Sequence, residues 1–112
     1  MDKLENYRQI VRKVLLPFSA LKFSDTNITN EAVYDTQNDR YVIITTGWEG
    51  KNKRIYFNYV HLDIINGKVW IQYDGTEDGV GYTLEAEGIP KEDIVPAFHP
   101  VDVRPYTGYG VA

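Results

Sequence analysis

The sequence predicts an α+β domain in which an N-terminal helix packs on a twisted antiparallel sheet of about four strands. Three observations support this class: a helical apolar stripe at the start, alternating apolar and polar residues in the middle, and an Asn66-Gly67 turn between two apolar runs. Short helices and an ordered aromatic tail are expected at the C-terminus. With 112 residues, the chain fits a single domain over residues 1–112.

Residues 2–16 are predicted to form an amphipathic helix. Apolar side chains recur there at helical spacing, and the main ones are Leu4, Tyr7, Val11 and Val14. Asp2 can cap the helix, with Glu5 three residues later completing a capping-box pattern. Pro17 is expected to end the helix, because proline lacks the N–H that the next turn needs. Residues 18–30 are expected to form a polar loop.

Residues 31–36 and 40–48 are predicted strands on either side of a turn at residues 37–39. Residues 54–77 are predicted to form a hairpin, because an Asn-Gly pair suits the positive φ angles of a tight type I′ turn. The second strand alternates apolar residues on both faces, which indicates a central position. Four strands in sequence order, a meander, are the simplest topology.

The two-residue turn predicts the register of this hairpin, because pairing proceeds outward from Ile65 and Lys68. One face should belong to the core, with the pairs Val60–Tyr73, Leu62–Ile71 and Ile64–Val69. The other face should be polar with aromatic rings, with the pairs Tyr59–Asp74, His61–Gln72 and Asp63–Trp70. A functional surface is expected on this second face.

The C-terminal third departs from the strand pattern. Residues 82–87 are predicted to form a short helix that Gly88 closes, and residues 90–95 a helical turn with Pro90 at its first position. The tail over residues 97–112 carries Phe98, Tyr106 and Tyr109. Because exposed aromatic surface is unfavourable, this tail is expected to dock on its own sheet or on another subunit.

Composition excludes several classes of protein. The chain has no cysteine, so disulfides, cysteine zinc sites and thiol catalysis are excluded. Its charged start lacks the apolar segment of a signal peptide, and no run approaches the ~20 apolar residues of a membrane span. A soluble cytoplasmic protein is therefore expected.

Charge is distributed in blocks around a net charge of −4. Residues 51–68 hold four bases and one acid, whereas residues 69–95 hold one base and seven acids. An acidic domain is a poor nonspecific DNA binder, because such binding depends on neutralising phosphates. A protein partner is therefore favoured over nucleic acid.

Polar residues on the second face admit two interpretations. His61, Asp63 and Asp74, with Gln72, can bind a cation or perform acid–base chemistry. The same residues can instead form a structural hydrogen-bonded network. Because these residues match no known catalytic motif, no catalytic residue, metal ligand or cofactor is assigned. The turn around Glu77 lacks the spacing of a calcium loop and suits a basic partner surface.

Two sets of residues are candidates for contact with partners. The candidate protein interface comprises Trp48, Tyr59, His61, Asp63, Trp70, Gln72, Asp74, Glu77, Tyr106 and Tyr109. The candidate DNA-contact residues are Arg8, Arg12, Lys13, Lys51, Lys53 and Arg54. Since one helix cannot cover both faces of the sheet, an uncovered apolar–polar patch predicts a homo-oligomer, a stable heterocomplex, or both.

Four segments carry a resemblance to a known family. They read GWEGKNKRIY, HLDIINGKVWIQYDGTE, GIPKEDIVPAFHP and RPYTGYGVA. In this order the chain resembles the XisI-like family of excision controlling factors, from MDKLENYRQIV to the final Val-Ala. The resemblance implies a non-enzymatic accessory role in site-specific excision of a DNA element, with the recombination chemistry in a separate recombinase.

The same resemblance implies the partners. Members are associated with a companion protein, XisH, whose fold resembles that of endonucleases. The expected mechanism is protein–protein contact with this companion or with the recombinase. An antitoxin-like regulator of the companion nuclease and a direct DNA-binding accessory protein are the alternatives. The family has no catalytic motif, so no catalytic residue is carried over to this sequence.

Overall fold

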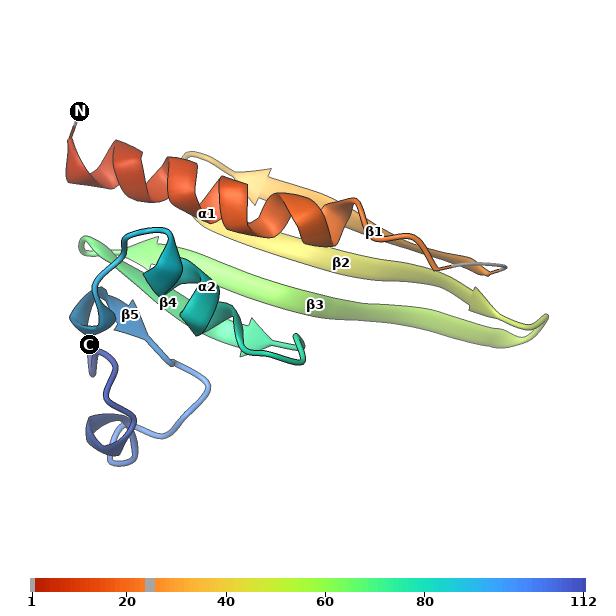
Figure 1. The fold of residues 1–112 in the computed structure, drawn as a ribbon. Coiled ribbons are helices and arrows are strands. Elements are labelled where there is room, and N and C mark those ends of the chain that lie inside the picture. The colour runs from red at the N-terminus through yellow and green to blue at the C-terminus, as the bar shows by residue number, and fades with distance from the viewer. Residues whose placement is uncertain (1, 24–25) are drawn as a thin grey trace.

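The computed structural model describes residues 2–23 and 26–112. Two α-helices are present in this part of the chain, α1 (Lys3–Ser19) and α2 (Val80–Ala86). The strands of the same part are β1 (Asn27–Asp35), β2 (Arg40–Glu49), β3 (Lys53–Ile65), β4 (Lys68–Asp74) and β5 (Ile94–Val95). They form one sheet in sequence order, and both helices lie on the same face of it (Figure 1). The predicted α+β class is confirmed.

The edge of the sheet differs from the predicted meander. The first four strands pair antiparallel, but β5 pairs parallel to β4 through Val69–Ile94 and Trp70–Val95. Residues 90–95 were predicted to form a helical turn, and Lys91–Asp93 do form a 3-10 turn, whereas Ile94 and Val95 form β5 instead. The apolar pair at the end of this segment is fully buried. Burial against β4 therefore outweighs the local helical pattern.

Helix α1 begins as predicted and ends later. The Asp2 carboxylate accepts a hydrogen bond from the Glu5 N–H at 2.7 Å, which caps the first turn. Pro17 was expected to end the helix, but α1 continues to Ser19. A proline in the last turn removes only one backbone hydrogen bond. The Asn30 amide also donates to the Phe18 carbonyl at 3.0 Å and so satisfies one of the last carbonyls of the helix.

The core lies between the two helices and the sheet. Helix α1 contributes the predicted stripe, although Leu4 is exposed. The buried apolar residues of the core include Tyr7, Val11, Leu15, Tyr41, Ile43, Val60, Leu62, Val69, Ile71, Val80 and Leu84. The central position predicted for β2 is confirmed, because it pairs with β1 on one side and β3 on the other.

Strand β1 is longer than predicted at its start. Residues 27–30 were expected in a loop, but they pair with β2 as far as Trp48. The segment carries no alternating apolar pattern, and polar contacts hold it instead. The Thr45 hydroxyl donates to the Asn30 side-chain oxygen at 2.6 Å, and both residues are buried.

A bulge in β4 changes the predicted register of the hairpin away from the Asn66-Gly67 turn. Near the turn the register is as predicted, with Leu62 opposite Ile71. Beyond that point the pairing shifts, so that His61 lies opposite Tyr73 and Gln72 has no partner in β3. Tyr73 was predicted to be in the core, but 51% of its surface is exposed. The predicted pairs of Val60, His61 and Tyr59 are therefore wrong.

The second bulge turns Tyr59 towards the helices. Ile43 pairs with Val60 and Ile44 pairs with Asn58, so Tyr59 is the extra residue of β3. Its ring packs edge-on against Phe18 of α1 at a centroid distance of 5.7 Å. The predicted position of Tyr59 on the opposite face, beside His61, is therefore wrong.

The aromatic tail is ordered, and it docks on its own chain. The Gly110 N–H donates to the Ile94 carbonyl at 2.8 Å. Only glycine fits at position 110, because a Cβ there would lie 2.5 Å from the Glu92 carbonyl oxygen. Arg104 folds the tail on itself, because its guanidinium donates to the carbonyls of His99 at 3.0 Å and Ala97 at 3.3 Å. The tail thereby wraps the β5 edge of the sheet, with Arg104 over the Trp70 ring and Tyr109 against α2.

Candidate functional site

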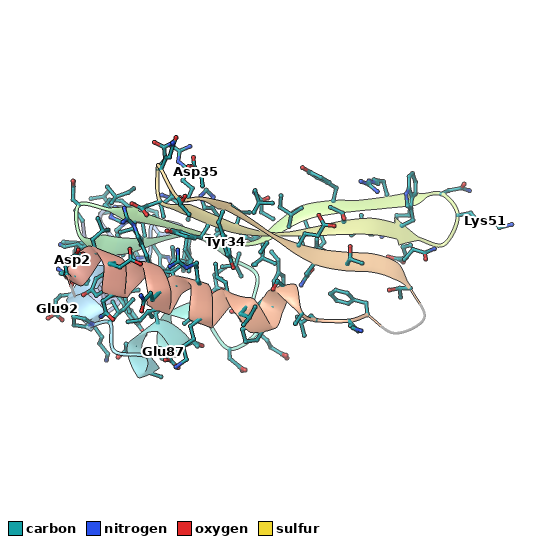
Figure 2. All side chains as sticks on the ribbon, turned by 90° about the horizontal axis from the view of Figure 1, so that it is seen from above. Asp2, Tyr34, Asp35, Lys51, Glu87 and Glu92 are labelled. Atoms are coloured by element: carbon teal, nitrogen blue, oxygen red, sulfur yellow. The ribbon has the colours of Figure 1, made fainter. Side chains whose placement is uncertain are left out.

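The open face of the sheet is the face opposite α1 and α2. Its residues follow from the strand register, and in β1 to β4 they include Val33, Val42, Ile44, Thr46, Trp48, Arg54, Tyr56, His61, Asp63, Trp70 and Tyr73. Figure 2 shows α1 on one side of the sheet and Lys51 at the far end of the β2–β3 hairpin. In the part of the chain that the structure describes, neither helix covers the open face over β1 to β3.

A hydrogen-bonded network lies in the middle of the open face. His61 Nε2 is 2.8 Å from Asp63 Oδ1, and the Gln72 side-chain amide donates to Asp63 Oδ2 at 3.2 Å. The bulge at Gln72 allows this side chain to reach Asp63. Because both oxygens of the buried carboxylate have a partner, the network fits the structural interpretation of these residues.

Asp74 does not join that network, although the sequence placed it on the same face. It lies opposite Val60, on the side of the helices. Its carboxylate accepts hydrogen bonds from the N–H groups of Thr76 at 2.9 Å and Val80 at 2.8 Å, so it holds the turn into α2. Among residues 2–23 and 26–112, no group of three or more His, Asp or Glu side chains is placed to bind a metal ion.

Two aromatic residues of the candidate interface, Trp70 and Tyr109, attach the tail to the rest of the chain. The Arg104 guanidinium lies 5.6 Å from the centre of the Trp70 ring, whose buried N–H has no partner within the described chain. The Tyr109 hydroxyl donates to Glu85 at 2.7 Å. Burial and the neighbouring Glu85 carboxylate raise the pKa of Tyr109 to about 12. Both residues therefore hold the tail, whereas Tyr106 is 89% exposed.

The arm is the end of the sheet that extends past the last turn of α1 (Figure 1). We define it as residues 46–57, which include the turn between β2 and β3. On its open face Arg54 lies 5.4 Å from the Trp48 ring and 5.9 Å from the Tyr56 ring. On its other face Phe57 is exposed beyond the helix. The arm therefore carries exposed aromatic rings on both faces.

The six candidate DNA-contact bases divide into two groups. Those of α1 lie beside carboxylates, in the pairs Arg8–Asp39 at 2.8 Å, Arg12–Glu5 at 3.6 Å and Lys13–Glu87 at 2.8 Å. The three bases of the arm have one carboxylate neighbour among the described residues, at 3.7 Å between Lys53 and Glu49. The positive charge of the arm is therefore less compensated than that of α1.

Comparison with known proteins decides the family. The sequence profile of the family described as "XisI protein" matches residues 1–111. The chain belongs to the XisI family. A crystal structure of a XisI-like protein from Anabaena variabilis ATCC 29413 has 34% identity and a TM-score of 0.89, covering 99% of this chain and 100% of that chain.

A second crystal structure shows the same fold. It is described as the fdxN element excision controlling factor XisI of Anabaena variabilis ATCC 29413, with 31% identity and a TM-score of 0.85, and the match covers 99% of this chain and 100% of that chain. No curated protein sequence matches this XisI-family chain. Within the described residues, no helix is long and apolar enough to cross a lipid bilayer.

Three features of this XisI-family protein were missed in the sequence. Tyr73 was assigned to the core, and the exposed aromatic residues Tyr56 and Phe57 were not singled out. Arg104 was interpreted only as part of the tail, although it connects the tail to Trp70. The interleaved bases and aromatics of the arm were a usable signal for Tyr56, whereas the position of Tyr73 depends on a bulge with no local signature.

A partly buried ion pair connects α1 of this XisI-family protein to the β1–β2 turn. The Arg8 guanidinium donates to both oxygens of Asp39, at 2.8 and 3.1 Å, and the Tyr41 hydroxyl donates to the same carboxylate at 3.0 Å. These hydrogen bonds, Arg8 first, lower the pKa of Asp39 below its ordinary value of 3.8. Burial and Asp39 raise the pKa of Tyr41 to about 12.

The ion pair makes a prediction for acidic solutions. Because the folded state lowers the pKa of Asp39, its stabilising contribution is complete above about pH 4 and is lost as the pH falls through the folded-state pKa. We expect Asp39→Asn to show less loss of unfolding free energy than the wild type between neutral pH and pH 2, measured by urea unfolding. Asparagine tolerates the positive φ of 54° at this position. Equal pH dependence in both proteins would contradict the assignment.

Proposed function

We propose that this XisI-family protein is a non-enzymatic controlling factor in the excision of a DNA element, and that it acts by binding other proteins. Family membership and the 31% identity to a structure described as an excision controlling factor support the role in excision. The name of that factor favours a controlling role over a catalytic one. The hydrogen bonds from His61 and Gln72 to the Asp63 carboxylate also favour a structural role for these residues over a catalytic one.

The open face is the observation that carries the proposed mode of action. Val33 and Tyr73 are each 51% exposed on it, and Val42 and Ile44 lie half-buried between them. A sheet face with apolar and aromatic side chains beside a polar network has the composition of a protein interface. Since the aromatic residues of such faces often carry most of the binding energy, Tyr73 is the first residue to test.

The family resemblance is the ground for the proposed partner. An XisH-like companion with an endonuclease-like fold, or the recombinase that performs excision, is the expected protein on the open face. In the alternative, antitoxin-like control, the protein binds the companion through the same face and lowers its nuclease activity. The two outcomes are separated by measuring whether the companion's nuclease activity falls when the complex forms.

The test is co-expression of this protein with an XisH-like companion, followed by affinity purification. We expect a stoichiometric complex whose dissociation constant rises about tenfold or more in Tyr73→Ala, because aromatic anchors of an interface are each worth more than about 1 kcal/mol. Leu16→Ala is the matched control, since Leu16 is exposed on α1 away from the open face. Unchanged affinity in a folded Tyr73→Ala protein would overturn the use of this face.

Direct DNA binding has narrower support. The net charge is −4 and the bases of α1 lie beside carboxylates, which leaves the arm as the basic surface. If phosphate contacts dominate, affinity for duplex DNA must fall steeply with salt concentration. The arm is considered separately below, where DNA binding is one of the outcomes.

A further inference from the structure

The chain is more extended than a compact domain of its size. Its radius of gyration is 15.0 Å, whereas about 13 Å is usual for this number of residues. Its accessible surface is 7039 Å², whereas about 6,300 Å² is usual for this mass. The arm contributes to this shape, because β2 and β3 extend well past the last turn of α1 (Figure 1). The excess surface includes the exposed aromatic rings of the arm.

The tip of the arm combines charge with these aromatic rings. Lys51, Lys53 and Arg54 lie within four residues of the sequence. Tyr56, two residues further on, is 64% exposed. A projecting element of this composition suits an acidic surface that contains a hydrophobic pocket.

The same chain carries such a surface between α2, the end of β4 and the tail. A cavity of about 170 Å³ lies there, and its lining includes Ile71, Tyr82, Phe98 and Tyr109. Two of these rings, Tyr82 and Phe98, are themselves exposed. For comparison, an apolar cavity of roughly 150 Å³ accommodates a benzene molecule. The cavity is therefore large enough for one aromatic side chain.

Acidic residues lie beside this cavity. Asp74 lines it, and the loop that follows carries Glu77 and Asp78, both exposed. Within residues 2–23 and 26–112, no basic side chain forms an ion pair with any of these three carboxylates. We call this the acidic pocket. Its charge is opposite to that of the arm tip, and its aromatic lining suits the aromatic rings of the arm.

We propose that two copies of this chain form a dimer in which the arm of each copy packs against the acidic pocket of the other. The basic tip meets Glu77 and Asp78, and Tyr56 is the aromatic side chain that enters the pocket. Exchange of identical arms forms two equivalent contacts about a two-fold axis, which closes the assembly at two copies.

A charge-swap experiment tests the dimer with the full chain. The arm variant carries Lys51→Glu and Lys53→Glu, and the pocket variant carries Glu77→Lys and Asp78→Lys. Asp74 is left unchanged because it holds the turn into α2. Light scattering coupled to gel filtration measures the mass of the wild type, each variant, their equimolar mixture, and a chain with all four changes.

We expect the wild type to be a dimer and each single-site variant to be a monomer. The dissociation constant should rise by about 100-fold, because like charges then face each other at both contacts. The mixture and the four-change chain should both return to the dimer, since opposite charges face each other again. Tyr56→Ala should weaken the wild-type dimer, whereas Tyr56→Phe should not.

Several outcomes would overturn the proposal. A monomeric wild type, or a wild-type dimer that survives both variants, rules out the arm–pocket contact. A monomer whose affinity for duplex DNA is salt-dependent and lost in the arm variant would assign the arm to nucleic acid instead. The proposed role in excision does not depend on these results, because binding of a companion protein to the open face is measured separately with Tyr73→Ala.

Discussion

Replacing Leu15 by alanine is expected to lower the free energy of unfolding by about 2–5 kcal/mol. Leu15 has no exposed surface and lies in the core formed by α1 and the sheet. Truncation to alanine removes buried methyl groups and leaves a cavity that the neighbouring core residues only partly fill. Because domains of this size are stable by about 5–15 kcal/mol, this is a large fraction of the total.

The neighbouring residue gives a matched control. Leu16 is 65% exposed on the outer side of the same helix, so Leu16→Ala changes the same number of atoms without forming a cavity. We expect the unfolding free energy of that variant to stay within about 0.5 kcal/mol of the wild type. Urea unfolding followed by circular dichroism measures both variants. Equal effects at the two positions would show that α1 does not pack on the sheet as described.

Helix α1 and the β3–β4 turn were predictable because their signals are local. The apolar stripe of α1 repeats along the helix, and Asp2 stands where a cap is needed. Asn66 and Gly67 have φ values of 51° and 76°, as a type I′ turn requires. In each case a few consecutive residues determine the structure, so tertiary contacts reinforce the local preference.

The bulges at Tyr59 and Gln72 were not predictable from the local pattern. Continuous alternation along β3 and β4 is equally compatible with a regular ladder. The ring of Tyr59 packs against Phe18, which is distant in the sequence, and Gln72 hydrogen-bonds to Asp63. These contacts exist only after the strands and α1 have assembled. Because a shift of one residue moves a side chain to the other face of the sheet, the predicted faces of Tyr59, Tyr73 and Asp74 were wrong.

The charges of the candidate site show the same limit. Arg8, Arg12 and Lys13 form a basic stripe in the sequence, but each has a carboxylate neighbour in the structure. Two of these neighbours, Asp39 and Glu87, come from distant segments. Composition therefore predicted the number of bases correctly, whereas the surface that keeps its positive charge depends on the fold.

Replacing Gly47 by alanine is expected to destabilise the protein by about 3 kcal/mol or more. Gly47 lies in β2 opposite Ile28, at the base of the arm, with φ at +151°. A Cβ at this position would lie 2.0 Å from the Asn27 carbonyl oxygen and 2.6 Å from the Ile28 Cα. Both contacts involve backbone atoms, so no side-chain rotation can relieve them. The strands β1 and β2 must separate locally.

Gly50 provides the control for this variant, because it lies in the β2–β3 turn of the same arm. Its φ is +65° and no atom lies within 4 Å of the position that an alanine Cβ would take, so Gly50→Ala introduces backbone strain without a collision. We expect a loss of about 1–2 kcal/mol there. Urea unfolding measures both losses, and hydrogen exchange at the Ile28 and Thr46 amides reports where the strands open. Faster exchange confined to these amides in Gly47→Ala would locate the damage at the base of the arm, whereas unchanged exchange and stability would contradict the close approach of β1 to β2.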